Sequence, residues 1–239
     1  MATRTGDGPA PVADEPEFDH PYVTVDVVLL TVRAEQLAVL VTRRDHAPAG
    51  FVLPGAFVKM AEDVSQTAAR VIHDKVGLLE VPEFLALRPF GAVDRDPRRR
   101  VITLPHLALV DRDRLHRATR AAAPDVTFAE VRLVESQLTI TIDGQTERLV
   151  FDHEAILQAA VNEARRLIRL DDPRIHAQLL PETFTLRQLQ HVHEAVLGEP
   201  VNRDSFRRRV LTSERLEKTS QYEQAVEHRP AQLYRWRTR

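Results

Sequence analysis

The sequence contains no cysteine, which excludes disulfides, thiolate nucleophiles and cysteine-ligated metal centres. A reducing cytoplasm is therefore the expected compartment. The longest apolar runs, such as residues 27–32, fall far short of the roughly 20 residues that span a bilayer, and the N-terminus has no apolar signal core, so no membrane partner is expected. Glycine is also scarce, with eight residues and no GxGxxG pattern, which leaves a Rossmann dinucleotide site without support.

The charge is unevenly distributed along a chain that is close to neutral as a whole. It has 239 residues, 43% of them apolar, which is enough for one large core or two small ones. The formal net charge of −2 argues against an obligate nucleic-acid binder. Residues 174–239, however, carry 12 basic and 8 acidic residues, a net charge of +4, and the remaining 173 residues carry 21 basic and 27 acidic ones, a net charge of −6. An acidic domain followed by a basic one is therefore predicted.

Residues 1–19 have almost no large apolar side chains before Phe18, and we predict a disordered tail there. Beyond it, β-branched runs alternate with turn residues, and one stretch from Asp63 to a stop at Gly77 has helical spacing with an Asp63/Gln66 capping box. A mixture of strands enclosing a helix indicates an α/β or α+β domain. The predicted strands are a hairpin of residues 23–32 and 36–44, a strand at 51–58 interrupted by a Pro54-Gly55 turn, strands at 85–93, 101–110 and 126–133, and a hairpin over 138–151 turned at Asp143-Gly144.

After residue 151 the strand pattern gives way to helices. Residues 152–170 form one amphipathic helix with Ile156, Ala160, Leu167 and Leu170 near one side. A helix over 185–196 with a Thr185/Gln188 capping box, a short turn, a second helix capped by Asn202 and a hairpin after residue 219 then follow. Helix, turn, helix and hairpin is the order of elements in a winged helix-turn-helix domain.

The second short helix has an apolar face and a basic face. Phe206 and Val210 lie four residues apart and form the apolar anchor, while the arginines project elsewhere. Guanidinium groups suit phosphate oxygens and the guanine edge in the major groove. A helix for protein interaction or a plain solvated surface is the alternative. The predicted DNA-binding residues are Asn202 and Ser205 at the helix start, Arg203, Arg207 and Arg208 toward the groove, and Lys218 and Arg229 at the wing.

The segment LPGAFVKMAEDVSQTAARVIHDKVGL resembles the Nudix box. The family pattern is a glycine, five intervening residues, a glutamate, seven intervening residues, and then an Arg-Glu-apolar-x-Glu-Glu-x-Gly-apolar stretch. Ala56 stands where the box glycine is expected. The residues that match in register are Glu62, Arg70, Ile72, Gly77 and Leu78.

The box departs from the family at the positions that would hold a metal. In the family, glutamates at the positions of Val71, Asp74 and Lys75 hold Mg²⁺ against a substrate diphosphate, and on a regular helix these positions share one face. A valine supplies no oxygen and an ammonium repels the ion. The degenerate site, formed by Glu62 together with Val71, Asp74 and Lys75, therefore predicts no bound metal and weak or absent hydrolysis. A plain amphipathic core helix, or catalysis through rearranged ligands, is the alternative.

The combination of such a domain with a winged helix resembles the Nudix-related transcriptional regulators of the NrtR family. The resemblance extends to residues 20–150 and to LLPETFTLRQLQHVHEAVLGEPVNRDSFRRRV and HRPAQLYRW. It implies a Nudix-type α/β/α sandwich with a mixed sheet, then a mainly helical winged helix-turn-helix domain. Ser205 stands where relatives are expected to carry asparagine. The implied domains are a tail at 1–19, an effector-sensing domain at 20–152, a linking helix at 153–173 and a DNA-binding domain at 174–239.

The resemblance also implies a function. The implied function is that of a cytoplasmic, homodimeric repressor of NAD-biosynthesis genes. Such a repressor binds a palindromic double-stranded DNA operator and carries no cofactor. An ADP-ribose-like effector is expected to release it from the DNA. Helix 153–170 is the expected transmitter or dimer element. An active ADP-ribose hydrolase and a regulator that senses a sugar remain alternatives. The expected effector residues are arginines that can hold a diphosphate and one aromatic side chain, namely Arg43, Phe51, Arg70, Arg98, Arg99 and Arg100.

Overall fold

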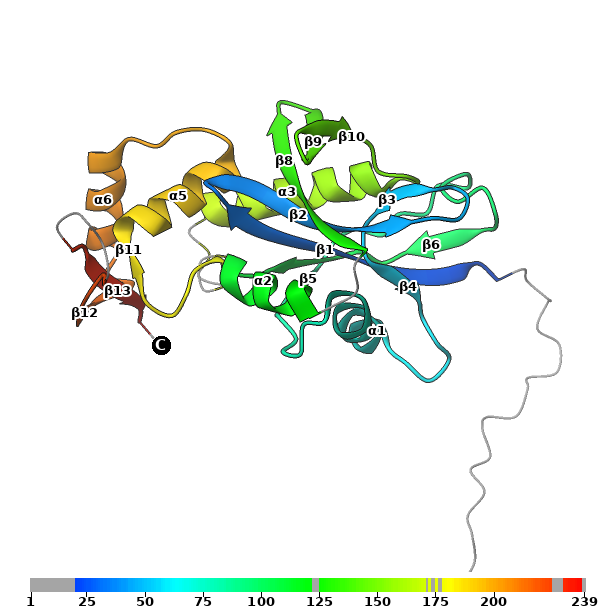
Figure 1. Cartoon of the computed structure of the whole chain (residues 1–239), viewed down its shortest axis with the longest axis horizontal. Helices are drawn as coiled ribbons and strands as arrows, with labels where there is room; N and C mark the ends of the chain where they lie inside the picture. Colours follow the sequence, from blue (N-terminus) through cyan, green and yellow to red (C-terminus); the bar gives the residue numbers. More distant parts are fainter. Residues whose placement is uncertain are drawn as a thin grey trace, which may run out of the picture.

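The computed structural model describes residues 20–121, 125–170, 172, 175, 178–224 and 230–237, so the predicted tail lies outside the described residues. Figure 1 shows a large body, a sheet with helices on both faces, and a small body at one end of the long axis that contains α5, α6 and β11 to β13. Within the described ranges, no helix is long and apolar enough to cross a membrane.

The large body is built on a mixed sheet. The path of hydrogen-bonded neighbours runs β10-β9-β8-β2-β1-β7-β5, with β3 joined to β2, and with β4 and β6 joined to β1. Strand β1 is antiparallel to β2 and β4 but parallel to β6 and β7. The strands are β1 (Tyr22–Arg33), β2 (Gln36–Arg44), β3 (Gly50–Val52), β4 (Gly55–Phe57), β5 (Phe84–Ala86), β6 (Val101–Thr103), β7 (His106–Leu109), β8 (Val126–Val134), β9 (Gln137–Ile142) and β10 (Gln145–Glu147).

The alternating side chains of β1 divide the interior into two layers. Val28 and Leu30 enter the core on the face that α3 (His153–Arg169) covers. Val27 and Leu29 point to the other face, which α1 (Val64–Val71) and α2 (Arg112–Ala121) cover. Because successive residues of a strand point to opposite faces, the apolar run of residues 27–30 in β1 fits between two helical layers. The predicted α/β/α sandwich with a mixed sheet is confirmed.

The helix of the Nudix-like box begins as predicted but ends differently. Asp63 accepts a hydrogen bond from the backbone of Gln66, and the Gln66 side chain accepts one from the backbone of Asp63, so the capping box is confirmed. The last turn, Ile72–Val76, is a π-helix that ends at Gly77 with φ 75°. The expectation of one regular helix to Gly77 is therefore wrong in its last turn. A π turn rotates the following side chains away from the positions of a regular helix.

Three further expectations need correction. Helix α2 was not predicted, because its sequence is strongly polar and, among its described side chains, only Leu115 is fully buried. The strand expected over 101–110 is divided into β6 and β7 by Leu104 and Pro105, and a proline has no N–H for the ladder. The strand expected over 85–93 is only β5 followed by a bridge from Phe90 to Thr103.

Helix α3 belongs to the core of the large body and continues that core into the small one. Ile156, Leu157 and Leu167 are buried against the sheet. Leu170, expected on the same side, is 61% exposed because the helix has ended at Arg169. The cluster that contains the α3 side chains also contains Leu189 and Phe206 of the small body, so the two bodies share a continuous apolar interior.

The small body is a winged helix domain. It consists of β11 (Phe184–Thr185), α5 (Leu186–Leu197), α6 (Arg203–Thr212), β12 (Leu216–Tyr222) and β13 (Gln232–Trp236), with β13 central in a three-stranded antiparallel sheet. The Thr185/Gln188 capping box and the Asn202 cap are both present, and Gly198 ends α5 with φ 76°. The predicted order of helix, turn, helix and hairpin is confirmed.

Candidate nucleic-acid interface and ligand pocket

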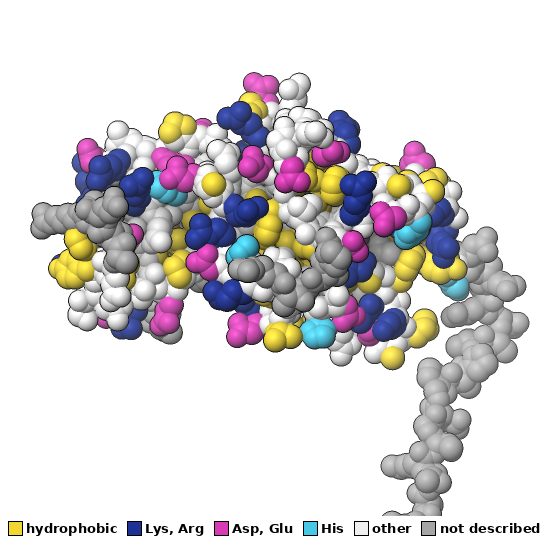
Figure 2. All heavy atoms as spheres, viewed as in Figure 1, with side chains coloured by type: hydrophobic (Ala, Val, Ile, Leu, Met, Phe, Trp, Pro, Cys, Tyr) yellow, Lys and Arg dark blue, Asp and Glu magenta, His cyan; other side chains and the backbone are white. Residues whose placement is uncertain are grey.

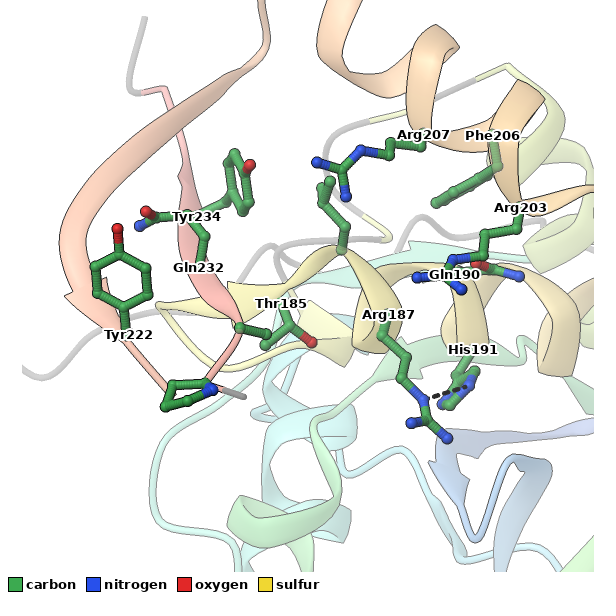
Figure 3. Close-up of a pocket in the computed structure, with 13 residues that line it drawn as sticks. Thr185, Arg187, Gln190, His191, Arg203, Phe206, Arg207, Tyr222, Gln232 and Tyr234 are labelled. Atoms are coloured by element: carbon green, nitrogen blue, oxygen red, sulfur yellow. Dashed lines mark hydrogen bonds between the residues drawn. The ribbon is translucent and has the colours of Figure 1, made fainter. Parts of the chain in front are cut away.

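A concave surface of about 730 Å³ lies between the two helices of the winged domain and its hairpin. Figure 3 shows Arg203 and Arg207 projecting from α6 into this space, with Tyr222, Gln232 and Tyr234 of the hairpin on its other side. Arg187 from the first turn of α5 also lines it. In Figure 2, Lys and Arg side chains gather at the end of the molecule where α6 lies. The surface therefore offers three guanidinium groups from two helices to an anionic ligand.

The packing of α6 fixes which side chains reach this surface. Phe206 and Val210 are 4% and 8% exposed and anchor the helix. The Phe206 ring lies edge-on against His193 of α5, with 4.8 Å between ring centroids. Phe206 also lines the concave surface, and the exposed Arg203 and Arg207 lie beside this apolar pair, each three residues before one of its members. The predicted apolar anchor of the helix is confirmed.

The structure brings together only part of the predicted DNA-binding set. Ser205, Arg208 and Lys218 are exposed but do not line the concave surface. Asn202 caps α6, since its side-chain oxygen accepts the backbone N–H of Ser205 at 3.0 Å. Arg229 lies outside the described residues. Most of the lining residues were not predicted, among them Arg187, Gln190 and Tyr222. The position of Arg187 in the first helix of the helix-turn-helix was the signal that could have found it.

A second pocket, of about 380 Å³, lies in the large body around β1 and the short strands β4 and β6 that pair with it. Its side chains come from β1, β2, β4, the π turn, the loop before β6 and the start of α3. The lining contains four cationic side chains and two carboxylates, so the pocket favours an anionic ligand. These charged residues are Arg44, Lys75, Arg95, Arg98, Asp26 and Asp96.

Phe151 forms an aromatic wall of this pocket between two guanidinium groups. The guanidinium carbons of Arg44 and Arg98 lie 5.6 and 5.3 Å from its ring centroid. Arg98 also binds Asp96, with its Nη2 2.7 Å from Oδ2, and hydrogen bonds from this guanidinium lower the pKa of the Asp96 carboxyl. Phe57 lines the same pocket and is 43% exposed. An aromatic face beside arginines suits a ligand with a planar ring and a phosphate group.

The floor of the pocket is a buried charge cluster. Arg95 donates to Asp152 at 2.8 and 2.7 Å and lies 3.5 Å from Asp26. His153 Nδ1 accepts the backbone N–H of Leu53 at 2.9 Å, and burial lowers the pKa of His153, so the neutral ring carries its proton on Nε2, 3.8 Å from Asp26 Oδ1. A side chain at Gly55 would place its Cβ 2.1 Å from Asp26 Oδ1, so only glycine fits there.

Lys75 reaches this pocket from the π turn. Its ammonium donates a hydrogen bond to the Gly55 carbonyl oxygen. Burial lowers the pKa of Lys75, and Arg70 and Arg44 act in the same direction, while Asp26 opposes the shift. The ammonium therefore stands at the position where the family pattern would place a metal-binding carboxylate.

The remaining residues of the box do not form a metal site. Glu62 is bound by Arg70, with 2.7 Å between Nη2 and Oε2, and this hydrogen bonding lowers the pKa of Glu62 to about 2. Val71 is 1% exposed inside the core, and Asp74 contacts His73 on the outside. The side chains at positions 71, 74 and 75 were expected to share one helix face, but they point in different directions. Among the described residues, no group of three His, Cys, Asp or Glu could hold a metal ion, so these residues do not fit Mg²⁺.

Of the six expected effector residues, the structure places only Arg98 in the pocket lining. Arg43 and Phe51 pair across β2 and β3, and Arg70 holds Glu62 and the Phe57 carbonyl. Arg99 lies over Tyr22, and Arg100 binds the Gly91 carbonyl. Neighbouring arginines in extended chain point to opposite sides, so Arg44 lines the pocket and Arg43 does not. Arg95, Phe151 and His153 were not predicted either, although Phe151 and His153 lie at the start of a predicted helix.

Two family models match the chain. The model described as "NUDIX domain" matches residues 20–170, and the model described as "NrtR DNA-binding winged helix domain" matches residues 176–236. A curated relative, the "ADPR responsive transcriptional repressor NtrR" of Acinetobacter baylyi, is 30% identical over 224 residues, which are 92% of this chain and 84% of the relative.

Solved structures of similar proteins match both domains of the chain. The NrtR of Shewanella oneidensis complexed with a 27mer DNA is 29% identical with a TM-score of 0.70, and the match covers 90% of this chain and 93% of that one. A MutT/nudix family protein from Enterococcus faecalis is 24% identical with a TM-score of 0.73 over 94% of this chain and 89% of that one, and it shares the fold.

Proposed function

This chain belongs to the NrtR family, in which a NUDIX domain precedes a winged helix domain, and on this premise we propose that it is a DNA-binding transcriptional repressor. The observation that carries the proposal is the concave surface with Arg187, Arg203 and Arg207 between the helices and the hairpin. In a winged helix, α6 is the recognition helix that enters the major groove. The similarity to a relative solved with DNA supports this orientation.

The test is a titration of the full chain against double-stranded DNA from the region upstream of its own gene. We expect nanomolar affinity and a steep decrease in affinity with salt, because bound arginines release counterions from the phosphates. A scrambled DNA of equal length is the control. Equal affinity for both DNAs would contradict the proposal.

The effector we propose is ADP-ribose or a related nucleotide. The pocket has an excess of cationic side chains, and Phe151 between Arg44 and Arg98 can stack on a ring while the guanidinium groups hold phosphate. The relative from Acinetobacter baylyi is named as ADPR responsive, which supports the same ligand. Saturating ADP-ribose should weaken the binding of the upstream DNA. An effect of L-arabinose without an effect of ADP-ribose would instead favour a sugar sensor.

We propose that the NUDIX domain does not hydrolyse this ligand. Its support is the placement of Val71 in the core, Asp74 on the outside and an ammonium from Lys75 in the pocket. The measurement is release of AMP from ADP-ribose in the presence of Mg²⁺. Turnover that depends on Mg²⁺ and disappears in Glu62→Gln would identify an active hydrolase.

The assembly that we propose is a cytoplasmic homodimer on a palindromic operator of NAD-biosynthesis genes. Palindromic half-sites mirror the two-fold symmetry of a dimer, so the DNA stoichiometry and the spacing of the protected half-sites test this point. We propose functional units at 20–152 for effector sensing, 153–173 for the link and 174–239 for DNA binding. Helix α3 packs within the sensing unit and contacts the DNA-binding unit.

A further inference from the structure

Helix α3 touches the ligand pocket at one end and the winged domain at the other. Phe151 and His153, on either side of its N-cap position, both line the pocket. Thirteen residues separate Asp152 from Arg165, which corresponds to about 20 Å along a helix. Figure 1 shows α3 lying along the sheet and ending beside α5. A displacement of the pocket end of α3 would therefore also move its other end, which lies against the helix-turn-helix.

The pocket end of α3 is held by a contact that a diphosphate would compete for. Arg95 binds both oxygens of Asp152 in the same paired geometry that guanidinium groups use for phosphate. The preceding residue, Phe151, has φ 62°, a left-handed conformation that an aromatic residue holds only when its surroundings impose it. Loss of the Arg95 contact to Asp152 would therefore favour another backbone conformation at the start of α3.

The far end of α3 is joined to the winged domain by Arg165. Its Nε donates to the Val196 carbonyl at 3.0 Å, and its Nη2 donates to the Leu133 carbonyl at 2.6 Å. Val196 lies in the last turn of α5, whose carbonyls lack helical partners and attract cations. A Cβ at Gly198 would lie 2.8 Å from the same Nη2, so the glycine makes room for the guanidinium. One side chain thus joins α3, β8 and α5.

We propose that Arg165 is the positioning residue that couples the ligand pocket to the orientation of the recognition helix. It lines neither the ligand pocket nor the concave surface of the winged domain. It fixes α5 against α3, and α5 in turn packs on α6 through His193 and Phe206. The inference rests on the proposed function, because it requires that the ligand and the operator oppose each other. By thermodynamic linkage, each then weakens the other's binding by the same factor, and this coupling factor is what Arg165 transmits.

The experiment measures this factor in the full chain with Arg165→Met, which keeps the aliphatic length and removes the donors. Operator affinity is titrated with and without saturating ADP-ribose, and ADP-ribose affinity is titrated with and without operator. In the wild type we expect the two ratios to agree at about 5-fold to 150-fold. In Arg165→Met both ratios should fall to within about twofold of unity, while ADP-ribose affinity without DNA stays close to the wild-type value.

Arg169→Met, an exposed arginine one turn along the same helix, is the matched control and should retain the wild-type ratio. If Arg165→Met does not fold, Arg165→Lys serves instead, since a lysine keeps the charge but not the two-pronged donor geometry. A wild-type ratio in a folded Arg165 variant would overturn the inference alone. A ratio of unity in the wild type would overturn the proposed effector response, and the inference with it, but not the proposed DNA binding.

Discussion

At the scale of single residues, the arginines of α6 differ in what they can reach. Arg203 and Arg207 line the concave surface, and Arg208 is exposed outside it. The three were equivalent in sequence, because spacing on a helix gives the angle between side chains but not the position of the hairpin. We therefore propose that Arg203 and Arg207 contribute more to DNA binding than Arg208 does.

Arg207→Ala should weaken operator binding by about 1–3 kcal/mol if the guanidinium reads a base edge. If it contacts a phosphate instead, the salt dependence of log Kd should become less steep by about one unit. Titrations at several salt concentrations separate the two outcomes. Arg148→Ala is the matched control, because Arg148 has an 84% exposed side chain on the large body and binds Glu154. An equal loss in both variants would indicate nonspecific electrostatics.

Lys75 gives the ligand pocket a predicted pH dependence. Since burial lowers its pKa, the ammonium is present at pH values below that pKa and is lost as the pH rises through it, earlier than for an exposed lysine. ADP-ribose affinity should therefore fall over a pH range below the ordinary lysine pKa of about 10.4. Calorimetric titrations across this range measure the effect. Lys75→Arg should give a flatter profile, and Lys75→Gln should lower affinity about tenfold at neutral pH. Identical profiles for wild type and Lys75→Arg would exclude Lys75 as the titrating group.

At the scale of elements, the start of α6 combines a structural and a functional role in Asn202. Its side chain caps the helix through the Ser205 N–H, and it sits beside the arginines of the recognition helix. These two roles can be separated, because aspartate caps a helix as well as asparagine does but carries a negative charge.

Asn202→Ala should lower the free energy of unfolding by about 1 kcal/mol, because the cap is lost. Asn202→Asp should leave that free energy within a few tenths of a kcal/mol, yet weaken operator binding by at least about tenfold through repulsion from the phosphates. Denaturant unfolding and DNA titration of the same samples test both statements. Full operator affinity in Asn202→Asp would place the start of α6 away from the phosphate backbone.

The elements show what sequence patterns can and cannot predict. The capping boxes at Asp63 and Thr185 and the Asp143-Gly144 turn were predictable because they depend on neighbours in sequence. Helix α2 was missed because its burial depends mainly on Leu115 meeting the opposite face of the sheet. The ligand pocket was largely missed for a similar reason. Arg44, Arg95 and His153 come from three distant segments, and only the fold brings them together.

At the scale of the whole molecule, one apolar cluster extends from the sheet through α3 into the winged domain. Two domains that share a core lose packing together, so the chain should unfold as one cooperative unit. This continuity also makes α3 part of both bodies, although the patterns predicted a linking helix.

Leu157→Ala, deep between α3 and the sheet, should destabilise the chain by about 2–5 kcal/mol. Trp236 is the single tryptophan and packs against Phe184 in the winged domain, so its fluorescence reports on that domain alone. We expect the unfolding midpoint measured by Trp236 fluorescence to shift together with the midpoint measured by far-ultraviolet circular dichroism. Leu79→Ala, at an 80% exposed side chain, is the control and should shift neither. A shift in circular dichroism with an unchanged fluorescence midpoint would show that the domains unfold independently.

The π turn at Ile72–Val76 bears on how such a regulator relates to hydrolases. Restoring the family's glutamates by substitution would not restore the metal site. A carboxylate at position 71 would enter the apolar core, where burial opposes its ionisation, and position 74 points outward. We propose that a metal site at the box would require the backbone of the turn to be rebuilt as well as its side chains. If the domain does not hydrolyse its ligand, the geometry of this one helical turn then opposes the evolution of hydrolysis as much as the replaced side chains do.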